Sequence, residues 1–220
     1  MEAKIMNVNP SLEGWCSNEK ALAMARVITD TKPAVCVEIG IFGGRSLIAM
    51  ATAMKFLKQS GHIGHVHGID PWLKNASIEG THAAVDQNWW GNIDHDAVML
   101  RFYNALSRLE LTDVCSFYRT TADRAVGLFD KIDVLHIDGN HSKEVSCRDV
   151  NIYFPKVKVG GFIWFDDVDW PTTKDAWTKV EQYSEKVFTV GGCNLYRKKS
   201  EFPISERKEI KDRRLRIDAK

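Results

Sequence analysis

The sequence predicts an α/β fold in which a mostly parallel sheet of seven strands lies between helices on both of its faces. Three observations support this prediction. Apolar runs of strand length alternate with helical patterns from about residue 17 to residue 185. Glycines and prolines separate many of these segments. Two further short strands, at about 186–190 and 193–198, are joined by Gly191 and Gly192, which predicts a terminal antiparallel hairpin.

The first part of the chain reads as two strand–helix units. Ser17 can cap a helix over 17–30, which has an apolar face and ends before Pro33. A strand over 34–39, a helix over about 45–58 and a strand over 65–69 follow. The stretch 71–112 interrupts the alternation and predicts an inserted cap or substrate segment. Its first half, 74–92, is polar and irregular, whereas 94–109 is helical in pattern.

The second part of the chain continues the alternation. The predicted elements are a strand over 114–118, a helix opening near Thr121, a strand over 132–137, a helix over 142–154, a turn at Gly160–Gly161, a strand over 162–165 and a helix near 172–185. We therefore expect one domain over 1–198 and a charged, mobile tail over 199–220.

The composition and charge of the chain argue against several classes of function. The 220 residues are 44% hydrophobic and 27% charged, and their formal net charge is +1. Residues 198–220 carry nine Lys or Arg and five Asp or Glu, so the rest of the chain is net acidic, which argues against a nucleic-acid substrate. The five cysteines form no Cys-x-x-Cys pair, and no apolar run is long enough for a membrane span. We expect a cytoplasmic protein with reduced thiols that does not bind membranes, and a homo-oligomer stays open.

A glycine-rich turn follows the first predicted strand. The pattern runs Glu38-x-Gly40-x-x-x-Gly44-x-Ser46 and leads into a helix. Glycines there let the backbone approach a ligand closely, and a helix start presents free N–H groups. Such a turn binds a nucleoside-containing cofactor at the carboxyl edge of a parallel sheet. Asp70 ends the second strand, where its carboxylate could accept hydrogen bonds from a ribose diol or could simply cap a turn before Pro71.

The pattern at Glu38–Ser46 resembles motif I of the class I S-adenosylmethionine (SAM) methyltransferases. It differs from the Gly-x-Gly-x-x-Gly of NAD enzymes. The resemblance implies a Rossmann-like class I methyltransferase fold and SAM as the cofactor. The residues that it implies at the cofactor site are Glu38, Gly40, Gly44, Ser46, Asp70, Thr121 and Asp138.

A second group of acids follows the fourth and fifth strands. Asp138 ends one strand, and Asp166 and Asp167 end the next. Oxygen ligands of this kind suit Mg²⁺ or another divalent cation, and a cation there would polarise a substrate hydroxyl. His141 lies three residues after Asp138 and could take the proton of that hydroxyl. The alternatives are capping acids and a polar residue at a helix start.

The runs Leu135–His141 and Gly160–Asp167 resemble the metal-dependent O-methyltransferases, above all those of sugars and macrolides and their cephalosporin-hydroxylase-like relatives. The resemblance covers roughly 12–198. It implies Asp138, Asp166 and Asp167 as metal ligands and His141 as the general base. Related aminocoumarin-type enzymes have Asp-Gly-Asp where this chain has Asn140, so the base assignment moves to His141.

These features together predict SAM-dependent methyl transfer to a hydroxyl of a small molecule, such as a sugar or glycosylated metabolite. Two alternatives are an NAD-dependent oxidoreductase on a similar sheet and a non-catalytic protein that binds SAM or a nucleotide. Two further features stay open at this point. His62, His65 and His67 form either a zinc site or a polar strand edge, and Trp89–Trp90 form either a lid, an oligomer contact or ordinary packing.

Overall fold

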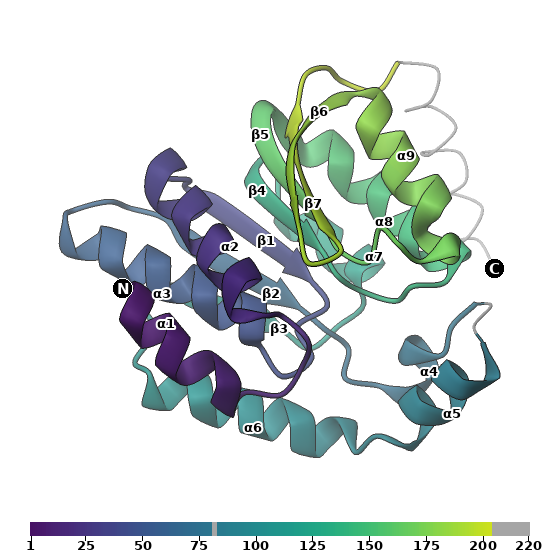
Figure 1. Cartoon of the computed structure of the whole chain (residues 1–220), viewed down its shortest axis with the longest axis horizontal. Helices are drawn as coiled ribbons and strands as arrows, with labels where there is room; N and C mark the ends of the chain where they lie inside the picture. The colour runs from purple at the N-terminus through teal and green to yellow at the C-terminus, as the bar shows by residue number, and fades with distance from the viewer. Residues whose placement is uncertain (81–82, 204–220) are drawn as a thin grey trace.

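The strands of the computed structural model, which describes residues 1–80 and 83–203, form one sheet within those ranges. Its order is β3-β2-β1-β4-β5-β7-β6, and only the pairings of β7 are antiparallel. The strands are β1 (Val35–Ile39), β2 (His65–Ile69), β3 (Cys115–Tyr118), β4 (Ile132–Ile137), β5 (Val157–Phe165), β6 (Ser184–Val190) and β7 (Cys193–Lys198). This sheet confirms the predicted fold class, including the terminal hairpin, in which β7 is inserted between β5 and β6 (Figure 1).

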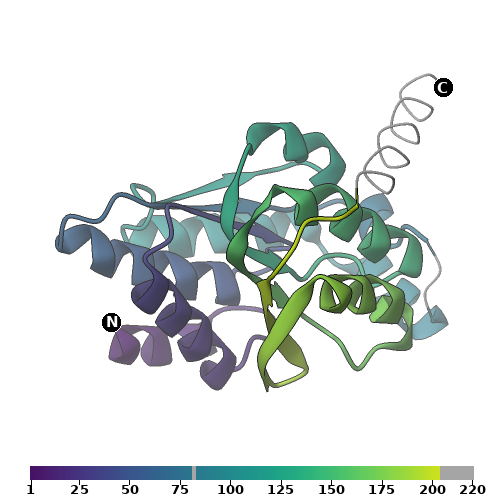
Figure 2. The same ribbon diagram turned by 90° about the horizontal axis from the view of Figure 1, so that it is seen from above.

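Helices cover both faces of the sheet (Figures 1 and 2). One face packs against α1 (Glu2–Val8), α2 (Asn18–Thr31), α3 (Arg45–Gln59) and α6 (His95–Arg108). The other face packs against α7 (Ala122–Ala125), α8 (Lys143–Tyr153) and α9 (Lys174–Gln182). Neighbouring strand residues alternate between these two cores: Cys36 lies in the first, for example, and Val37 in the second.

Two short helices stand apart from these layers, beyond the carboxyl ends of the strands. They are α4 (Lys74–Ser77) and α5 (Ala84–Asn92), seen at the lower right of Figure 1. Our expectation that 74–92 is irregular was therefore wrong for most of that stretch. The helix α5 has no amphipathic pattern and buries none of its residues, so its sequence lacks the periodicity by which a helix is recognised.

Three other boundaries differ from expectation. Gly160 and Gly161 do not end a turn before a strand but lie inside β5, which bulges there and continues to pair with β4. The last long helix, α9, is shorter than the predicted 172–185. The helix α1 was not predicted, although Ile5 is buried. Single-turn 3₁₀ helices lie at Asn9–Ser11, Val126–Leu128, Phe154–Lys156 and Pro171–Thr173.

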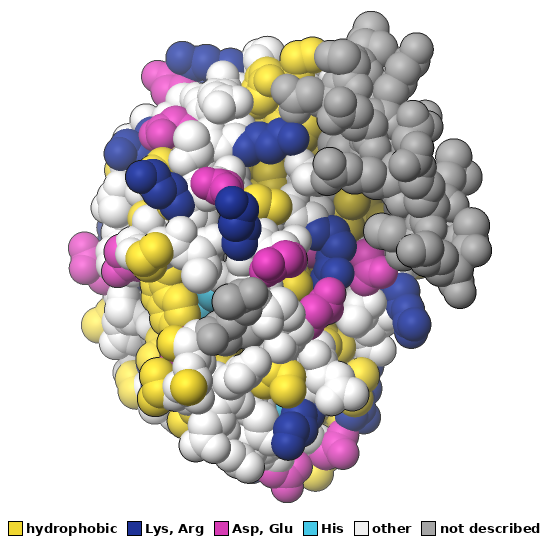
Figure 3. Space-filling view, turned by 90° about the vertical axis from the view of Figure 1, so that its right-hand side faces the viewer, with side chains coloured by type: hydrophobic (Ala, Val, Ile, Leu, Met, Phe, Trp, Pro, Cys, Tyr) yellow, Lys and Arg dark blue, Asp and Glu magenta, His cyan; other side chains and the backbone are white. Residues whose placement is uncertain are grey.

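The chain packs against the second core beyond the expected domain end at residue 198. Phe202 is buried, and its ring stacks on Phe154 with centroids 4.5 Å apart. The rest of the expected tail, 204–220, lies outside the described residues. None of the described helices is long and apolar enough to cross a membrane. On the face shown in Figure 3, basic and acidic side chains are interspersed among the described residues.

Candidate active site

The acids predicted at the strand ends meet at one edge of the sheet, because the strands that carry them are parallel neighbours. In register, β1 lies between β2 and β4, and β5 pairs with the other side of β4. Two adjoining cavities open at this edge, with volumes of about 110 Å³ and 500 Å³. Gly40, Phe42, Asp138, His141 and Trp170 are among the residues that line both. This is the expected ligand position in an open α/β sheet.

The glycine-rich turn between β1 and α3 requires its glycines. Gly40 has φ +87°, and a Cβ on it would lie 2.0 Å from the carbonyl oxygen of Asp138. Gly44 has φ +88°, and a Cβ there would lie 2.4 Å from the ring of Phe102. Gly40 therefore lets the β1 and β4 loops approach each other beside the cavities, whereas Gly44 permits packing of α6 and lines neither cavity.

Glu38 supports this turn from behind and lines neither cavity, and its expected role as a cofactor contact stays a prediction. Its side chain is fully buried. Glu38 Oε1 accepts a hydrogen bond from the Ser46 hydroxyl at 2.9 Å, and Oε2 lies 3.0 Å from His136 Nδ1. Ser46 is also buried and lines only the larger cavity.

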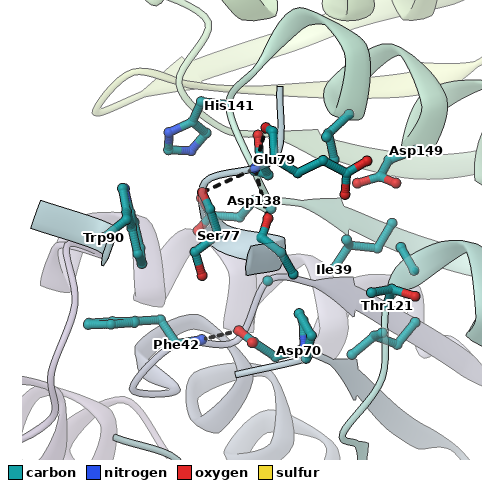
Figure 4. Close-up of a pocket in the computed structure, with 18 of the residues that line it drawn as sticks. Ile39, Phe42, Asp70, Ser77, Glu79, Trp90, Thr121, Asp138, His141 and Asp149 are labelled. Carbon is teal, nitrogen blue, oxygen red and sulfur yellow. Dashed lines mark hydrogen bonds between the residues drawn. The ribbon is translucent and has the colours of Figure 1, made fainter. Parts of the chain in front are cut away.

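Asp70 lies at the end of β2 and binds the backbone of the glycine-rich turn (Figure 4). Its Oδ2 accepts hydrogen bonds from the N–H groups of Ile41 at 3.0 Å and Phe42 at 2.9 Å. Its Oδ1 accepts from the N–H of Trp72 at 2.7 Å. Burial raises the pKa of Asp70, and these three hydrogen bonds oppose that shift. The predicted ribose contact stays a prediction, and Asp70 also fixes the loop.

The smaller cavity extends along β1 and β2 towards the start of α7. Figure 4 shows Asp70, Asp138 and Thr121 around it, with Asp149 on the far side from His141. Asp149, from α8, was not predicted as a site residue. It is buried, its Oδ1 has no hydrogen-bond partner, and burial raises its pKa to about 7. No motif in the sequence distinguishes it from an ordinary polar residue of a helix.

Asn140 ties the segment after α4 to the loop after β4. Its side-chain amide donates to the carbonyl oxygens of Ala76 at 2.9 Å, Ser77 at 3.1 Å and Glu79 at 3.0 Å. Its Oδ1 accepts from the N–H of Ser142 at 2.8 Å. Ala76, Ser77 and Glu79 line the smaller cavity. Asn140 thus holds the inserted segment over that cavity.

The three predicted metal ligands are divided between two groups. Asp166 is buried and forms an ion pair with Lys20 of α2, and its Oδ2 lies 3.6 Å from His136 Nε2. Although burial opposes the shift, His136 and Lys20 hold the pKa of Asp166 below its usual range. The negative charge of Asp166 is therefore already balanced by the ammonium of Lys20. Asp166 is not part of the group that contains Asp138 and Asp167.

Asp138, His141 and Asp167 form the second group, at the junction of the two cavities. One ligand atom from each lies within 4.8 Å of the other two. His141 Nε2 lies 2.8 Å from Asp167 Oδ2, and the His141 ring packs 4.7 Å from the ring of Trp170. Burial, and then the charge of Asp166, raises the pKa of Asp138 well above its usual value. Asp167, which lies beside His141, has a left-handed backbone conformation with φ +53°.

Aromatic rings from four separate segments line the larger cavity, and Trp170 belongs to the fourth. Trp15 stacks on Phe42 with ring centroids 5.3 Å apart, and the edge of Trp89 lies 5.1 Å from Trp15. Trp90 packs against Phe42 at 5.5 Å and lines both cavities. Trp89 and Trp90 therefore attach α5 to the glycine-rich turn and to the loop before α2. Among the readings left open, their position agrees with a lid over the cavity.

The rings of the three histidines near β2 each lie within hydrogen-bond distance of another group of the protein. His62 Nε2 lies 2.9 Å from the carbonyl oxygen of Pro33, and His65 Nε2 lies 2.9 Å from the hydroxyl of Ser116. His67 Nδ1 lies 3.2 Å from the hydroxyl of Tyr118. They are absent from the possible metal-binding groups of the described residues, which favours a polar strand edge.

Comparison with known proteins defines the class. A family model described as a methyltransferase domain matches residues 37–168, more than half of the chain. Uncharacterized protein R132 of Acanthamoeba polyphaga mimivirus is 30% identical over 172 residues, which are 71% of this chain and 66% of that protein. The match thus spans slightly less than two thirds of the viral relative.

Two solved structures are similar in fold. The SAH-bound methyltransferase PaMTH1 of Podospora anserina superposes with a TM-score of 0.63 at 11% identity, covering 90% of this chain and 88% of its own. The O-methyltransferase NovP superposes with a TM-score of 0.62 at 19% identity, covering 83% of this chain and 79% of its own.

The chain belongs to the methyltransferase-domain family. Its sheet order and its terminal hairpin are those of the class I SAM-dependent methyltransferases, as the resemblance at Glu38–Ser46 implied. The alternative of an NAD-dependent oxidoreductase is therefore set aside.

Proposed function

We propose that this protein transfers a methyl group from SAM to a hydroxyl oxygen of a small molecule. One observation carries the proposal: the cavity beside Asp70 and the larger cavity adjoin at Asp138 and His141. A donor in the first and an acceptor in the second would meet there, and positioning of that kind supplies much of the rate of a transfer reaction. The fold neighbours support it, because NovP is an O-methyltransferase and PaMTH1 was solved with SAH.

The smaller cavity fits the cofactor. The positive φ and close backbone approach at Gly40 form a cradle that any side chain would fill. Thr121 and Asp70 line the same cavity. When bound, SAM supplies an electrophilic methyl group on a sulfonium. The segment held by Asn140 would cover the cofactor and exclude water from it.

The larger cavity suits an uncharged acceptor with a ring. Its acidic lining residues outnumber its basic ones, since Lys20 and Arg45 are the only Lys or Arg against five Asp or Glu among the residues that line it. This balance disfavours phosphorylated or otherwise polyanionic acceptors. The faces of Trp15, Trp90 and Trp170 offer apolar surface to a sugar ring or a glycosylated metabolite.

Asp138, His141 and Asp167 fit a divalent cation, because two carboxylates and an imidazole converge within 4.8 Å. We propose that Asp138 and Asp167 would hold such an ion, Mg²⁺ or another, with water and acceptor oxygens completing its coordination. A bound cation would lower the pKa of the acceptor hydroxyl. His141, oriented by Asp167 and packed on Trp170, would accept the proton of that hydroxyl.

The test measures binding and turnover separately. Calorimetry should detect SAM binding and no comparable NAD binding. Formation of SAH with a panel of monosaccharides, glycosides and phenols then identifies the acceptor. EDTA should abolish turnover, and Mg²⁺ should restore it. Asp138→Asn should lose turnover while keeping SAM binding, whereas the exposed Asp130→Asn should behave as wild type. SAM binding without turnover on any acceptor would favour a non-catalytic protein, and absence of SAM binding would refute the proposal.

A further inference from the structure

Lys20 is a buried cation in the wall of the larger cavity. It lies in the first turn of α2, where the hydroxyl of Ser17 accepts a hydrogen bond from its backbone N–H at 3.1 Å. Only 7% of its side chain is exposed. On the same helix, the adjacent Ala21 and the residue one turn later, Met24, are fully buried in the core. The ammonium therefore reaches the carboxyl edge of the sheet from an otherwise apolar helix face.

The ammonium meets Asp166, which is one of the three carboxylates that the sequence suggests as metal ligands. The two side chains form a buried ion pair, and the imidazole of His136 also lies 3.6 Å from Asp166. A buried ion pair of this kind is costly to break by removing one partner, because the other is left uncompensated. A divalent cation that recruits Asp166 would have to displace Lys20 and would also approach its positive charge.

We propose that Lys20 sets the metal affinity of this site by holding Asp166 in an ion pair, so that two of the three suggested ligands, Asp138 and Asp167, are left for a divalent cation. This rests on the proposed function insofar as a cation is used there. It goes beyond that function because it assigns the third carboxylate, Asp166, to the ammonium of Lys20 instead of to the metal cation. The expected consequence is weak, readily reversible metal binding in the wild-type protein.

The inference predicts a gain of binding when Lys20 loses its charge. Binding of Mn²⁺ alone to the full-length protein is measured by calorimetry, without SAM or acceptor. Lys20→Gln should bind Mn²⁺ at least tenfold more tightly than wild type, because it frees a carboxylate and removes a repelling charge. Lys20→Arg keeps the cation and should bind as wild type does. Lys20→Gln combined with Asp166→Asn should lose most of the gain.

The outcomes separate this inference from the proposed function. A gain in Lys20→Gln that Asp166→Asn cancels supports the inference, even if wild type binds no Mn²⁺ and the metal step of the proposed function fails. Equal Mn²⁺ affinity of Lys20→Gln and wild type, or no binding by either, overturns it. SAM binding and methyl transfer are scored independently and stand or fall on their own.

A second measurement covers the case in which Lys20→Gln does not fold. Wild-type crystals soaked in Mn²⁺ are examined by anomalous scattering. An ion on Asp138 and Asp167 with the Lys20–Asp166 pair intact supports the inference. An ion coordinated by Asp166, with Lys20 turned away, overturns it.

Discussion

Glu38 and His136 face each other across β1 and β4 with Oε2 and Nδ1 3.0 Å apart, and neither side chain is exposed to solvent. Glu38 also accepts from the hydroxyl of Ser46 at 2.9 Å. The acid of the cofactor motif is thus a link between the glycine-rich turn and the strand that leads to Asp138. Its contribution is to hold the edge of the sheet together.

Replacing Glu38 by Gln should therefore affect stability more than chemistry. The change removes the carboxylate beside Nδ1 of the buried His136 imidazole, and breaking a buried pair by removing one partner typically costs about 3–5 kcal/mol. Ser46→Ala removes one hydrogen bond and should cost about 1 kcal/mol. Urea denaturation measures both, with the exposed Glu181→Gln as the control. A loss below about 1 kcal/mol for Glu38→Gln would show that the link is dispensable.

Asp70→Ala should weaken SAM binding by roughly tenfold to a hundredfold, the effect of 1–3 kcal/mol. The substitution strands the N–H groups of Ile41, Phe42 and Trp72, and it removes the predicted ribose acceptor. Calorimetry with SAM and with adenosine measures the loss for two ligands that share a ribose. Equal losses for both ligands are expected, since adenosine carries the same ribose. Unchanged affinity for both would exclude Asp70 from cofactor binding.

The sequence was sufficient for the sheet because the strands are short apolar runs bounded by glycine or acid. It also indicated which acids meet, since parallel strands bring their carboxyl ends to one edge. It could not show how those acids are paired. Lys20 and Asp166 lie 146 positions apart in the chain, and the ion pair that joins them depends on the packing of α2. A lysine beside the apolar positions Ala21 and Met24 was the available signal.

The inserted segment was the least predictable part for a related reason. The helix α5 buries no residue, and it is positioned by contacts of Trp89 and Trp90 with Trp15 and Phe42, which lie far away in the sequence. Similarly, Gly160 and Gly161 lie inside β5 and not in a turn because the strand pairs with β4 on both sides of them. Glycine is tolerated in a strand where the strand bulges. Local propensity carries neither kind of information.

Asn140→Ala should loosen the cover of the smaller cavity. The variant loses the side-chain amide whose two N–H groups are shared among three carbonyl oxygens of the segment 76–79, and a typical hydrogen bond is worth about 0.5–1.5 kcal/mol net. We expect SAM to dissociate about tenfold faster and limited proteolysis within 74–92 to accelerate. Stopped-flow displacement measures the first effect. Asn88→Ala, an exposed asparagine of α5, is the matched control. Unchanged dissociation would mean that the segment opens independently of Asn140.

Asp149→Asn should change how stability depends on pH. Burial raises the pKa of Asp149 from 3.8 to about 7, so the folded protein binds this proton more tightly than the unfolded chain. Its contribution to the free energy of unfolding is therefore present below about pH 4 and is lost as pH rises to about 7. The ceiling on that loss is about 4 kcal/mol. Relative to wild type, Asp149→Asn should gain stability between pH 5 and pH 8, as measured by urea denaturation. The exposed Asp130→Asn should show no such gain. Parallel pH curves for Asp149→Asn and wild type would contradict the assignment.

His141→Ala should lower kcat by about 10²–10⁴, the usual effect of losing a positioned general base, with little change in SAM affinity. The imidazole lies 2.8 Å from Asp167 at the junction of the two cavities, and the neighbouring Asn140 cannot accept a proton at working pH. The deficit should shrink as pH rises, because hydroxide then removes the proton of the acceptor without help. The measurement is kcat against pH for wild type and variant on the acceptor found by screening. His62→Ala is the control, because the ring of His62 lies away from the cavities and is hydrogen-bonded to the carbonyl oxygen of Pro33. A variant that keeps wild-type kcat at pH 7 would assign the proton to another group and leave His141 the role of ordering the loop after β4.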